Sequence, residues 1–369
     1  MKQGCEVVVT GDLVLDEPDA GHWLSGIAPA LQAADLAIGH LEVPHTDSRS
    51  EQPHDVPAPG APPANIAAIA RAGIGLVSLA GNHIADCGAQ GIADTIAALD
   101  AQGIGHGGAG PNLPAARRPA VREAGGLQVA LLSYNCVGPE FGWATADRAG
   151  CAYLPLKTVD GEPMAPQSIV AEIDPRAFEI LASDVVGARA VADIVIVAMH
   201  KGRVHTPAVI EPYERPLAHA AIDAGADAVI AHHAHIAKGI EFHRGQPIFH
   251  GLGNGCVVTR ALSPGQDHPA RAAWAERRKA LFGFEPEPGY ELAPFHPDAR
   301  LAMLGKLEFV RGASPAASII PLFVEPPGRP VLASGARAER VRRYIAQITA
   351  DGGLPPIVID ASGRVLKAA

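Results

Sequence analysis

The sequence predicts an α/β fold, because short apolar strands recur along the chain with helical segments between them. Five of these runs are rich in β-branched residues and nearly free of polar ones, as expected for strands covered on both faces. Each of the five stops at a polar or metal-binding residue. The runs span residues 7–10, 34–38, 74–80, 193–199 and 227–231.

The residues that follow these runs could form one site. In open α/β sheets, ligands bind beyond the carboxyl ends of the strands, where side chains from separate segments meet. The fifth run leads into His232, His233 and His235. If the chain stays extended past Ile230, His233 and His235 point to the same side, which suits Zn, Mn or Fe. A polar loop whose histidines bind backbone or water explains such a pair equally well.

The other elements are expected in a regular order. Helical segments are expected near residues 26–34, 63–72, 92–101, 177–192, 213–224 and 337–350. Further strands are expected at 127–135, 304–310, 318–324 and 357–360, with a hairpin around Arg244 and Gly245. Residues 45–64 are rich in proline and predict a loop over the site. Residues 137–176 lack a clear pattern, and residues 260–300 resemble helix and loop; both segments are interpreted as insertions.

Composition limits the class of protein. The 369 residues are 48% hydrophobic and 19% charged, as in ordinary soluble globular proteins. The net charge of −9 and the lack of a dense Lys/Arg patch argue against a nucleic-acid partner and favour a small molecule or peptide. No apolar run is long enough to span a membrane, and the first strand begins too early to leave room for a signal peptide. A cytoplasmic location without a membrane partner is therefore expected.

The cysteines do not form a recognisable framework. They are odd in number and scattered, and they lack the C-x-x-C spacing of zinc knuckles. We expect them to be reduced residues of the core. They are Cys5, Cys87, Cys136, Cys151 and Cys256.

Several motifs, taken in order, make the chain resemble the CapA family of poly-γ-glutamate capsule-synthesis proteins over roughly residues 5–258. They are Gly11-Asp12, Leu41-Glu42 with Pro44 and Thr46-Asp47, Gly81-Asn82-His83 with Asp86, Gly88 and Gly91, His200 with Gly202, Asp223 to Asp227, His233-Ala234-His235, Pro247 to Phe249, and Leu252 to Asn254. The resemblance implies a metallophosphoesterase-like β-sandwich core flanked by helices, with insertions over the site. Residues 1–258 would be the metal-dependent catalytic core, with an insertion at about 137–176. Residues 259–369 would add a further insertion and the strands and helix that complete the same domain.

The resemblance also implies a site for two divalent metal ions, Mn, Fe or Zn. Its ligands would be Asp12, Glu42, Asn82, His200, His233 and His235. Glu42 is expected to bridge the two ions, and the side-chain oxygen of Asn82 to bind one of them, with Gly81 permitting the turn before it. Val14 stands where related phosphoesterases have a histidine ligand, and His40 replaces a common asparagine. His40 could line the site or support a ligand.

Three residues are candidates for catalysis. The resemblance implies that His83 acts on the substrate rather than on a metal, although a structural imidazole is the alternative. Lys201 and His205 follow His200, and their charge or titration would favour an anionic substrate or proton transfer. Lys201 replaces a tryptophan of the family and Val204 a glutamate, and exposed loop charge is an equal alternative for Lys201. Further histidines, His250 and His296, are left without an assigned role.

Three functions fit this site. The first is metal-dependent hydrolysis of a phosphoester or amide bond in a small or peptide-like anionic substrate. The second is epimerisation of a peptide, in which a metal that holds a carboxylate or carbonyl acidifies the adjacent Cα–H and a histidine such as His83, His205 or His296 moves the proton. The third is a binding protein that holds metals without turnover.

Overall fold

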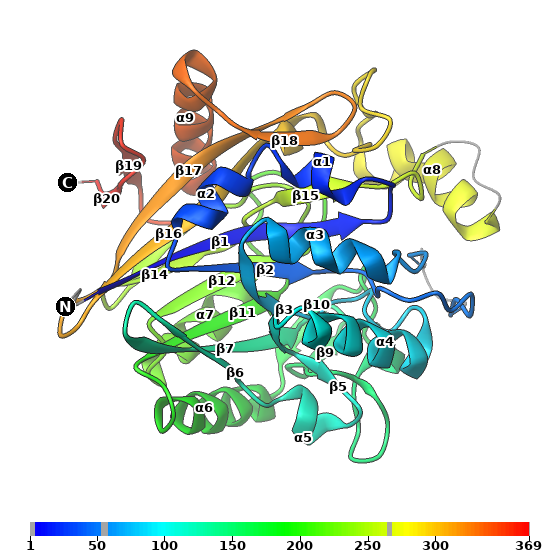
Figure 1. Cartoon of the computed structure of the whole chain (residues 1–369), viewed down its shortest axis with the longest axis horizontal. Coiled ribbons are helices and arrows are strands. Elements are labelled where there is room, and N and C mark those ends of the chain that lie inside the picture. The colour runs from blue at the N-terminus through cyan, green and yellow to red at the C-terminus, as the bar shows by residue number, and fades with distance from the viewer. Residues whose placement is uncertain (1–3, 53–57, 264–267, 369) are drawn as a thin grey trace.

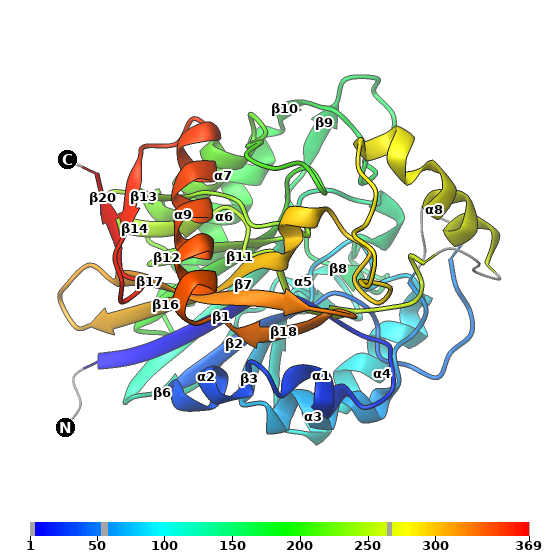
Figure 2. The same ribbon diagram turned by 90° about the horizontal axis from the view of Figure 1, so that it is seen from above.

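Two β-sheets packed face to face form the centre of the molecule, and helices cover the outer face of each sheet (Figures 1 and 2). The computed structural model describes residues 4–52, 58–263 and 268–368. The predicted α/β fold with a β-sandwich core flanked by helices is confirmed.

The first sheet is built around the N-terminal strand. It has eight strands, in the order β18-β17-β16-β1-β2-β3-β4, with β15 also paired to β1. Strands β1 to β4 and β15 run parallel, whereas β16 to β18 are antiparallel. The bounds are β1 Gly4–Leu15, β2 Leu36–Leu41, β3 Ile74–Ser78, β4 Gly105–Gly107, β15 Asn254–Val258, β16 Leu301–Val310, β17 Ala316–Glu325 and β18 Arg329–Leu332. The strands expected at 304–310 and 318–324 occur as β16 and β17, which pair with each other antiparallel.

The second sheet has six strands in the order β13-β14-β12-β11-β7-β6. Their bounds are β6 Ala120–Ala124, β7 Leu127–Asn135, β11 Ile194–His200, β12 Ala228–His232, β13 Ile240–His243 and β14 Gln246–Phe249. The predicted hairpin is confirmed, since β13 and β14 pair antiparallel around Arg244 and Gly245. These two residues have φ of 50° and 87°, the left-handed backbone that a tight two-residue hairpin turn requires.

Alternation along the strands divides the core into layers. Val7 and Val9 of β1 pack between the sheets with Ile196 of β11. Val8 points the other way, into the cluster beneath the covering helices. The helices over the first sheet are α1 Ala20–Leu24, α2 Ala28–Ala33, α3 Ile66–Arg71 and α4 Gly88–Ala101, and those over the second are α6 Pro175–Arg189 and α7 Glu214–Asp223. Helix α9, Gly335–Asp351, packs against β16 and β17.

The helix expected near residues 26–34 is confirmed as α2, and a further short helix, α1, precedes it, with residues 25–27 between the two. The side chain of Asp19 caps α1 by accepting a hydrogen bond from the backbone N–H of His22 at 3.2 Å. Pro29 lies in the first turn of α2, where a missing N–H costs nothing. The other five helices occur, although α4 begins at Gly88 rather than at residue 92.

The first inferred insertion, residues 137–176, contains the short elements η2 Glu140–Gly142, β8 Gly150–Cys151, β9 Leu156–Thr158 and β10 Val170–Ile173. The second, residues 260–300, contains α8 Pro269–Phe282 and η3 Pro297–Arg300. The remaining elements are η1 Pro63–Asn65, β5 Ala109–Gly110, α5 Leu113–Ala116, β19 Ile357–Ile359 and β20 Val365–Lys367. Residues 45–52 and 58–62 of the expected loop hold no helix or strand beyond an isolated bridge of His45 to Ala61, and residues 53–57 lie outside the described part.

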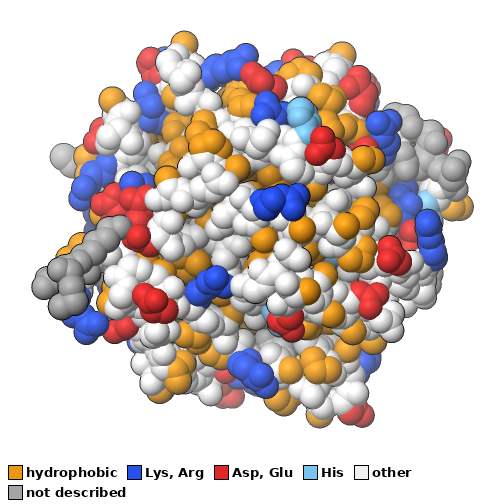
Figure 3. Space-filling view, in the orientation of Figure 1, with side chains coloured by type: hydrophobic (Ala, Val, Ile, Leu, Met, Phe, Trp, Pro, Cys, Tyr) orange, Lys and Arg blue, Asp and Glu red, His pale blue; other side chains and the backbone are white. Residues whose placement is uncertain are grey.

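Two expectations from composition concern the core and the surface. All five cysteines are buried and none is part of a disulfide, as expected. Within the described residues, no helix is both long enough and apolar enough to cross a bilayer. On the face in Figure 3, side chains of both charges are interspersed.

Candidate metal centre and cavity

Metal-binding side chains from both sheets meet at the carboxyl ends of the strands. In Figure 1, strands β1 and β2 point toward α8, and this end of the molecule holds the site. The donors are Asp12 in β1, His40 in β2, Glu42 just beyond β2, Asn82 after β3, His200 at the end of β11, and His233 and His235 after β12. The structure therefore brings all six predicted ligands to one region and adds His40.

Two glycines make room for these donors. A Cβ on Gly11 would lie 1.9 Å from the carbonyl oxygen of Gly253, so β1 can approach that backbone only with glycine there. The N–H of Asp12 donates to the same oxygen at 3.0 Å, which fixes Asp12. Gly81 has no left-handed φ, so the expected turn is not its role. Instead, a Cβ on Gly81 would lie 3.1 Å from His40 Nε2.

An inner group of donors consists of Asp12, His40 and His200. One ligand atom of each lies within 4.8 Å of the others, and all three residues are buried. His200 Nε2 lies 2.6 Å from Asn82 Oδ1, so Asn82 belongs to the same group. His40 is held by a contact of 3.0 Å between its Nδ1 and Ser78 Oγ. That contact leaves His40 Nε2 to face the donors.

An outer group consists of Asp12, Glu42 and His235, again with one ligand atom of each within 4.8 Å. His235 Nε2 lies 3.3 Å from Glu42 Oε1, and His235 Nδ1 lies 3.5 Å from Asp12 Oδ2. Asn254 Oδ1 holds the same Nδ1 at 3.0 Å, which orients the ring. The residue common to both groups is Asp12, whereas the sequence prediction gave the bridging position to Glu42.

The expected extended backbone after Ile230 was wrong beyond His232. Strand β12 ends at His232, and His233 and His235 have φ of 88° and 51°. The N–H of His233 points at the carboxylate of Asp12, 3.3 Å from each oxygen. Residues other than glycine rarely adopt this backbone, and at functional sites such strain is held by surrounding contacts. Both imidazoles still reach the site, through a tight loop rather than through strand alternation.

The donor set fits divalent metal ions. Several buried nitrogens and oxygens have no hydrogen-bond partner among the described residues: both ring nitrogens of His233, both carboxylate oxygens of Glu42, His200 Nδ1 and His40 Nε2. Leaving each such atom unpaired costs about 1–3 kcal/mol. A cation bound by imidazole nitrogens and carboxylate oxygens would satisfy them, and this mixture suits Zn, Mn or Fe.

The charge states of the metal-free site follow from burial and mutual repulsion. Burial lowers the pKa of His40 and His200 well below the usual value and that of His233 to about 3, so these imidazoles are neutral and able to bind a metal. Burial, with the charge of Glu42, raises the pKa of Asp12. For His235, burial opposes the charged form, but Glu42 and Asp12 raise its pKa to about 9.

We expect metal binding at pH 7.5 to release at least one proton, that of His235. His235 is protonated at any pH below its pKa of about 9, and it must lose that proton to bind a metal. Metal affinity should therefore rise by about tenfold per pH unit for each proton released, and the contribution of His235 should level off above pH 9. Calorimetry in buffers of different ionisation enthalpy measures the released protons. Heats that do not depend on the buffer would contradict the prediction.

His83 lies beside the metal-binding groups without belonging to either of them. Its Nδ1 is 2.7 Å from Asp86 Oδ2, and the same oxygen accepts the N–H of Ala58 at 2.6 Å. The imidazole also lines the cavity described below, with its side chain 20% exposed. A carboxylate behind one ring nitrogen fixes the tautomer and orientation of the other, which suits proton transfer to a bound substrate.

His205 and Lys201 are placed very differently. His205 lines the cavity, with its ring centroid 5.8 Å from that of His235, and burial lowers its pKa well below the usual value. Lys201 is fully buried and does not line the cavity. Its Nζ donates to Glu214 Oε2 at 2.5 Å and lies 3.1 Å from His250 Nδ1. The alternative of an exposed loop charge for Lys201 is therefore wrong, and the structure does not bring Lys201 together with the other two catalytic candidates.

The two histidines without an assigned role lie away from the donors. His250 continues the buried charge chain from Lys201, since its Nε2 lies 2.9 Å from Glu241 Oε1. His296 caps η3 by accepting the N–H of Asp298 at 3.1 Å, and it lines a separate small pocket. Neither lines the main cavity.

A largely apolar cavity opens over the donors and encloses about 790 Å³, part of it open to solvent. Glu42, Asn82, His83, His205, His233 and His235 line it on the metal side. The rest of the lining comes from segments of the insertions and strand ends: Trp274 and Phe282 of α8, Phe295, Pro166, Gln167, Asp16 and Thr259. Sequence reasoning missed Asp16 and Thr259. Their positions in the sequence could have identified them, because each is the first polar residue after the apolar residues that end a strand.

Fold and site together define a two-sheet α/β protein with a candidate metal centre at its strand ends. The family model described as "Bacterial capsule synthesis protein PGA_cap" matches residues 6–257, which is more than half of the chain. The chain belongs to this family. The resemblance to CapA-type proteins that was inferred from the motifs is therefore confirmed.

Individual relatives are more distant. A probable polyglutamine synthesis accessory protein of Mycobacterium tuberculosis is 34% identical over 196 residues, which are 52% of this chain and 47% of that protein. The capsule biosynthesis protein CapA of Bacillus anthracis is 27% identical over 235 residues, 62% of this chain and 52% of that protein. The chain thus spans about half the length of the curated relatives it matches.

A solved structure aligns with nearly the whole chain. The calcineurin-like phosphoesterase YfkN of Bacillus subtilis aligns over 95% of this chain and 98% of that chain, with 14% identity and a TM-score of 0.42.

Proposed function

We propose that this chain is a metal-dependent hydrolase that acts on a phosphoester or amide bond of a small or peptide-like anionic substrate. The observation that carries the proposal is the shared position of Asp12 between two donor groups, at the base of a cavity that also contains His83. Two groups joined by one carboxylate are the arrangement expected for a pair of ions. Membership of the capsule-synthesis family supports the peptide-like substrate.

A pair of divalent ions bound by these donors would supply an activated water and stabilisation of negative charge on the substrate. The inner ion would be held by Asp12, His40, Asn82 and His200, and the outer one by Asp12, Glu42 and His235. His233, whose two ring nitrogens lack partners, would complete this set. These donors suit Mn, Fe and Zn alike, and loading the protein with each metal separately identifies the one that supports activity.

His83 is the group that would deliver a proton to the leaving atom. Asp86 holds Nδ1 at 2.7 Å and stabilises the cationic ring, so the proton at the opposite nitrogen is available on the cavity side. His205 is neutral and buried at the cavity wall and would contact the substrate without adding charge. The aromatic wall of Trp274, Phe282 and Phe295 excludes water, which strengthens electrostatic interactions inside the cavity.

The proposal is tested with purified protein loaded separately with Mn, Fe(II) and Zn. The substrates are p-nitrophenyl phosphate, bis-p-nitrophenyl phosphate, γ-glutamyl p-nitroanilide and a γ-linked glutamate oligomer. We expect metal-dependent release of p-nitrophenol, p-nitroaniline or a free amino group from at least one of these substrates, and we expect a chelator to abolish this release. Deuterium incorporation from heavy water into the peptide without cleavage would support the epimerase instead. Metal binding with neither reaction would support the binding protein.

We also propose that residues 259–369 complete the same domain as residues 1–258. Strand β16 pairs with β1 from Gly4 to Val9, so the C-terminal strands extend the first sheet. Helix α8 contributes Trp274 and Phe282 to the cavity over the metal centre. Both contacts make the C-terminal part necessary to the fold and to the cavity.

A further inference from the structure

Besides the metal donor Glu42, one other carboxyl group, that of Asp16, lines the cavity among the described residues. Strand β1 ends at Leu15 and its parallel neighbour β15 ends at Val258, and these two residues are partners in the register. The next residues, Asp16 and Thr259, therefore leave the sheet side by side. Thr259 Oγ1 donates to Asp16 Oδ2 at 2.6 Å, and both residues line the cavity. The carboxyl group of Asp16 is thus fixed in position.

The second oxygen of this carboxyl group, Oδ1, accepts no hydrogen bond from the described residues and is shielded from solvent. Its neighbours along the cavity wall, Val14, Val257 and Leu262, are apolar. A buried carboxylate oxygen without a donor is costly, and the fold gains nothing from it, because a neutral side chain would also accept from Thr259.

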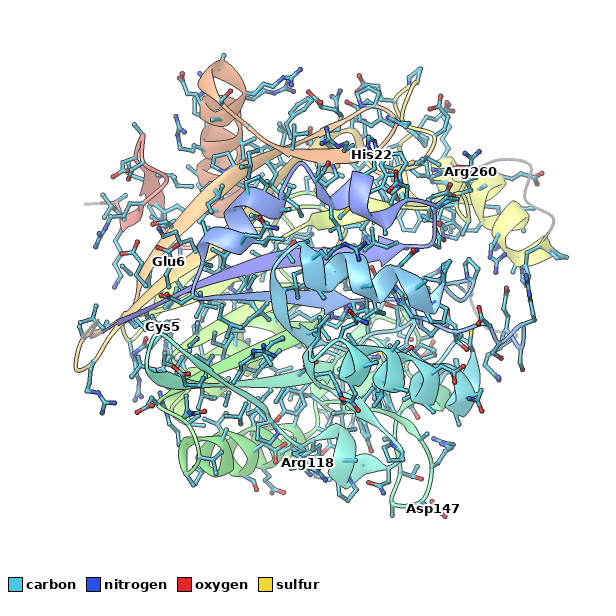
Figure 4. The ribbon with its side chains drawn as sticks, in the orientation of Figure 1. Cys5, Glu6, His22, Arg118, Asp147 and Arg260 are labelled. Carbon is cyan, nitrogen blue, oxygen red and sulfur yellow. The ribbon has the colours of Figure 1, made fainter. Side chains whose placement is uncertain are left out.

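The charged groups nearest Asp16 are already paired with other residues. Glu17 pairs with Arg260, with Oε2 3.1 Å from Nε. Arg260 lies near the end of β15 that faces α8, where it is labelled in Figure 4. Arg271 of α8 forms its ion pair with Glu51. Burial accordingly raises the pKa of Asp16 to about 7, with Glu17 adding to the rise and Arg271 opposing it.

The cavity lining therefore contains the metal donors Glu42, His233 and His235 and a further carboxyl group, that of Asp16, which belongs to neither group of donors. We propose that Asp16 binds a protonated amino group of the substrate, while an anionic group of the same molecule lies at the metal centre. This inference rests on the proposed function and narrows its substrate class to amino-acid-like or peptide-like molecules that carry an ammonium group.

The test uses non-hydrolysable ligands, so that it does not depend on which bond is cleaved. Calorimetry at pH 8, where Asp16 is ionised, compares ω-aminoalkylphosphonates of increasing chain length with alkylphosphonates of equal length on metal-loaded protein. At one length, the amino compound should bind roughly tenfold or more tightly, as expected for a hydrogen bond to a charged group. Asp16→Asn, which can still accept from Thr259, should abolish this preference and leave alkylphosphonate binding unchanged.

Glu17→Gln is the matched control, because it removes the neighbouring carboxylate that already pairs with Arg260. It should keep the preference for the amino compound. A preference that is absent at every chain length, or that survives in Asp16→Asn, would overturn the inference.

Alkylamines separate this inference from the proposed function. They carry no anionic end, so the difference in their binding between wild type and Asp16→Asn, measured on metal-free protein, tests Asp16 without the metal centre. We expect n-alkylammonium ions to bind the wild-type chain more tightly than Asp16→Asn, measured by calorimetry or by the shift of the Asp16 carboxyl resonance. If no phosphonate binds but this difference is found, the result contradicts the proposed metal-dependent function and supports the binding of ammonium groups by Asp16. If alkylamines bind both proteins equally, the assignment of Asp16 is overturned.

Discussion

Replacing His83 by asparagine is expected to lower the rate of hydrolysis by about 10²–10⁴-fold and to leave the metal content unchanged. His83 belongs to neither group of metal donors, yet it lines the cavity with Asp86 behind its Nδ1 at 2.7 Å. Removing it should take away the proton donor without disturbing the ligands. The measurements are kcat on the best substrate of the panel and metal content by elemental analysis of the same protein.

A second His–Asp pair offers the control. His106 of β4 lies 3.2 Å from Asp100 through its Nε2, at the surface and away from the cavity. His106→Asn should leave both rate and metal content unchanged. If His83→Asn loses metal in proportion to activity, His83 is a ligand and the proton-transfer role is lost. If it loses neither, the imidazole is structural.

The positions of the strand ends in the sequence predicted which metal donors would lie close together, but not the backbone geometry that places them. Apolar runs that stop at polar residues indicated where Asp12, Asn82 and His200 would meet, because the chain direction of parallel strands is fixed by the fold class. The path after His232 was not predictable in this way. An Ala-His-His-Ala-His segment is compatible with an extended strand, and it takes the carboxylate of Asp12, distant in sequence, to hold the N–H of His233 in a left-handed turn.

The position of Lys201 could not be inferred from its place next to a metal donor in the sequence. It was a catalytic candidate because it follows His200, but the chain stays extended for one residue beyond β11, where the N–H of Lys201 donates to the carbonyl of His232, so its side chain faces away from that of His200. Lys201 accordingly lies under the sheet with Glu214 and His250. Alternation could have predicted this. The presence of Asp16 in the cavity wall needed the pairing of β1 with β15, and the aromatic wall needed the position of α8, both of which depend on contacts between distant segments.

Replacing Glu42 by glutamine is expected to remove most of the stabilisation that metal gives to the folded protein. Both oxygens of Glu42 are buried without a hydrogen-bond partner among the described residues, and Oε1 lies 3.3 Å from His235 Nε2. The amide keeps the shape but loses the charge and one oxygen donor. Because Glu42 is a direct ligand in the proposed site, the affinity should fall by more than the roughly 10–100-fold caused by changes around metal ligands.

The expected size follows from linkage between binding and folding. A metal present at about a thousand times its Kd stabilises the folded state by about 4 kcal/mol, and this gain disappears once Kd rises to the metal concentration used. Chemical denaturation with and without metal measures the difference for wild type and for Glu42→Gln. Glu308→Gln, a change on the surface of β16, should retain the full wild-type gain. Equal gains in wild type and Glu42→Gln would mean that the ion binds elsewhere, because a ligand carboxylate cannot be neutralised without weakening the binding of its cation.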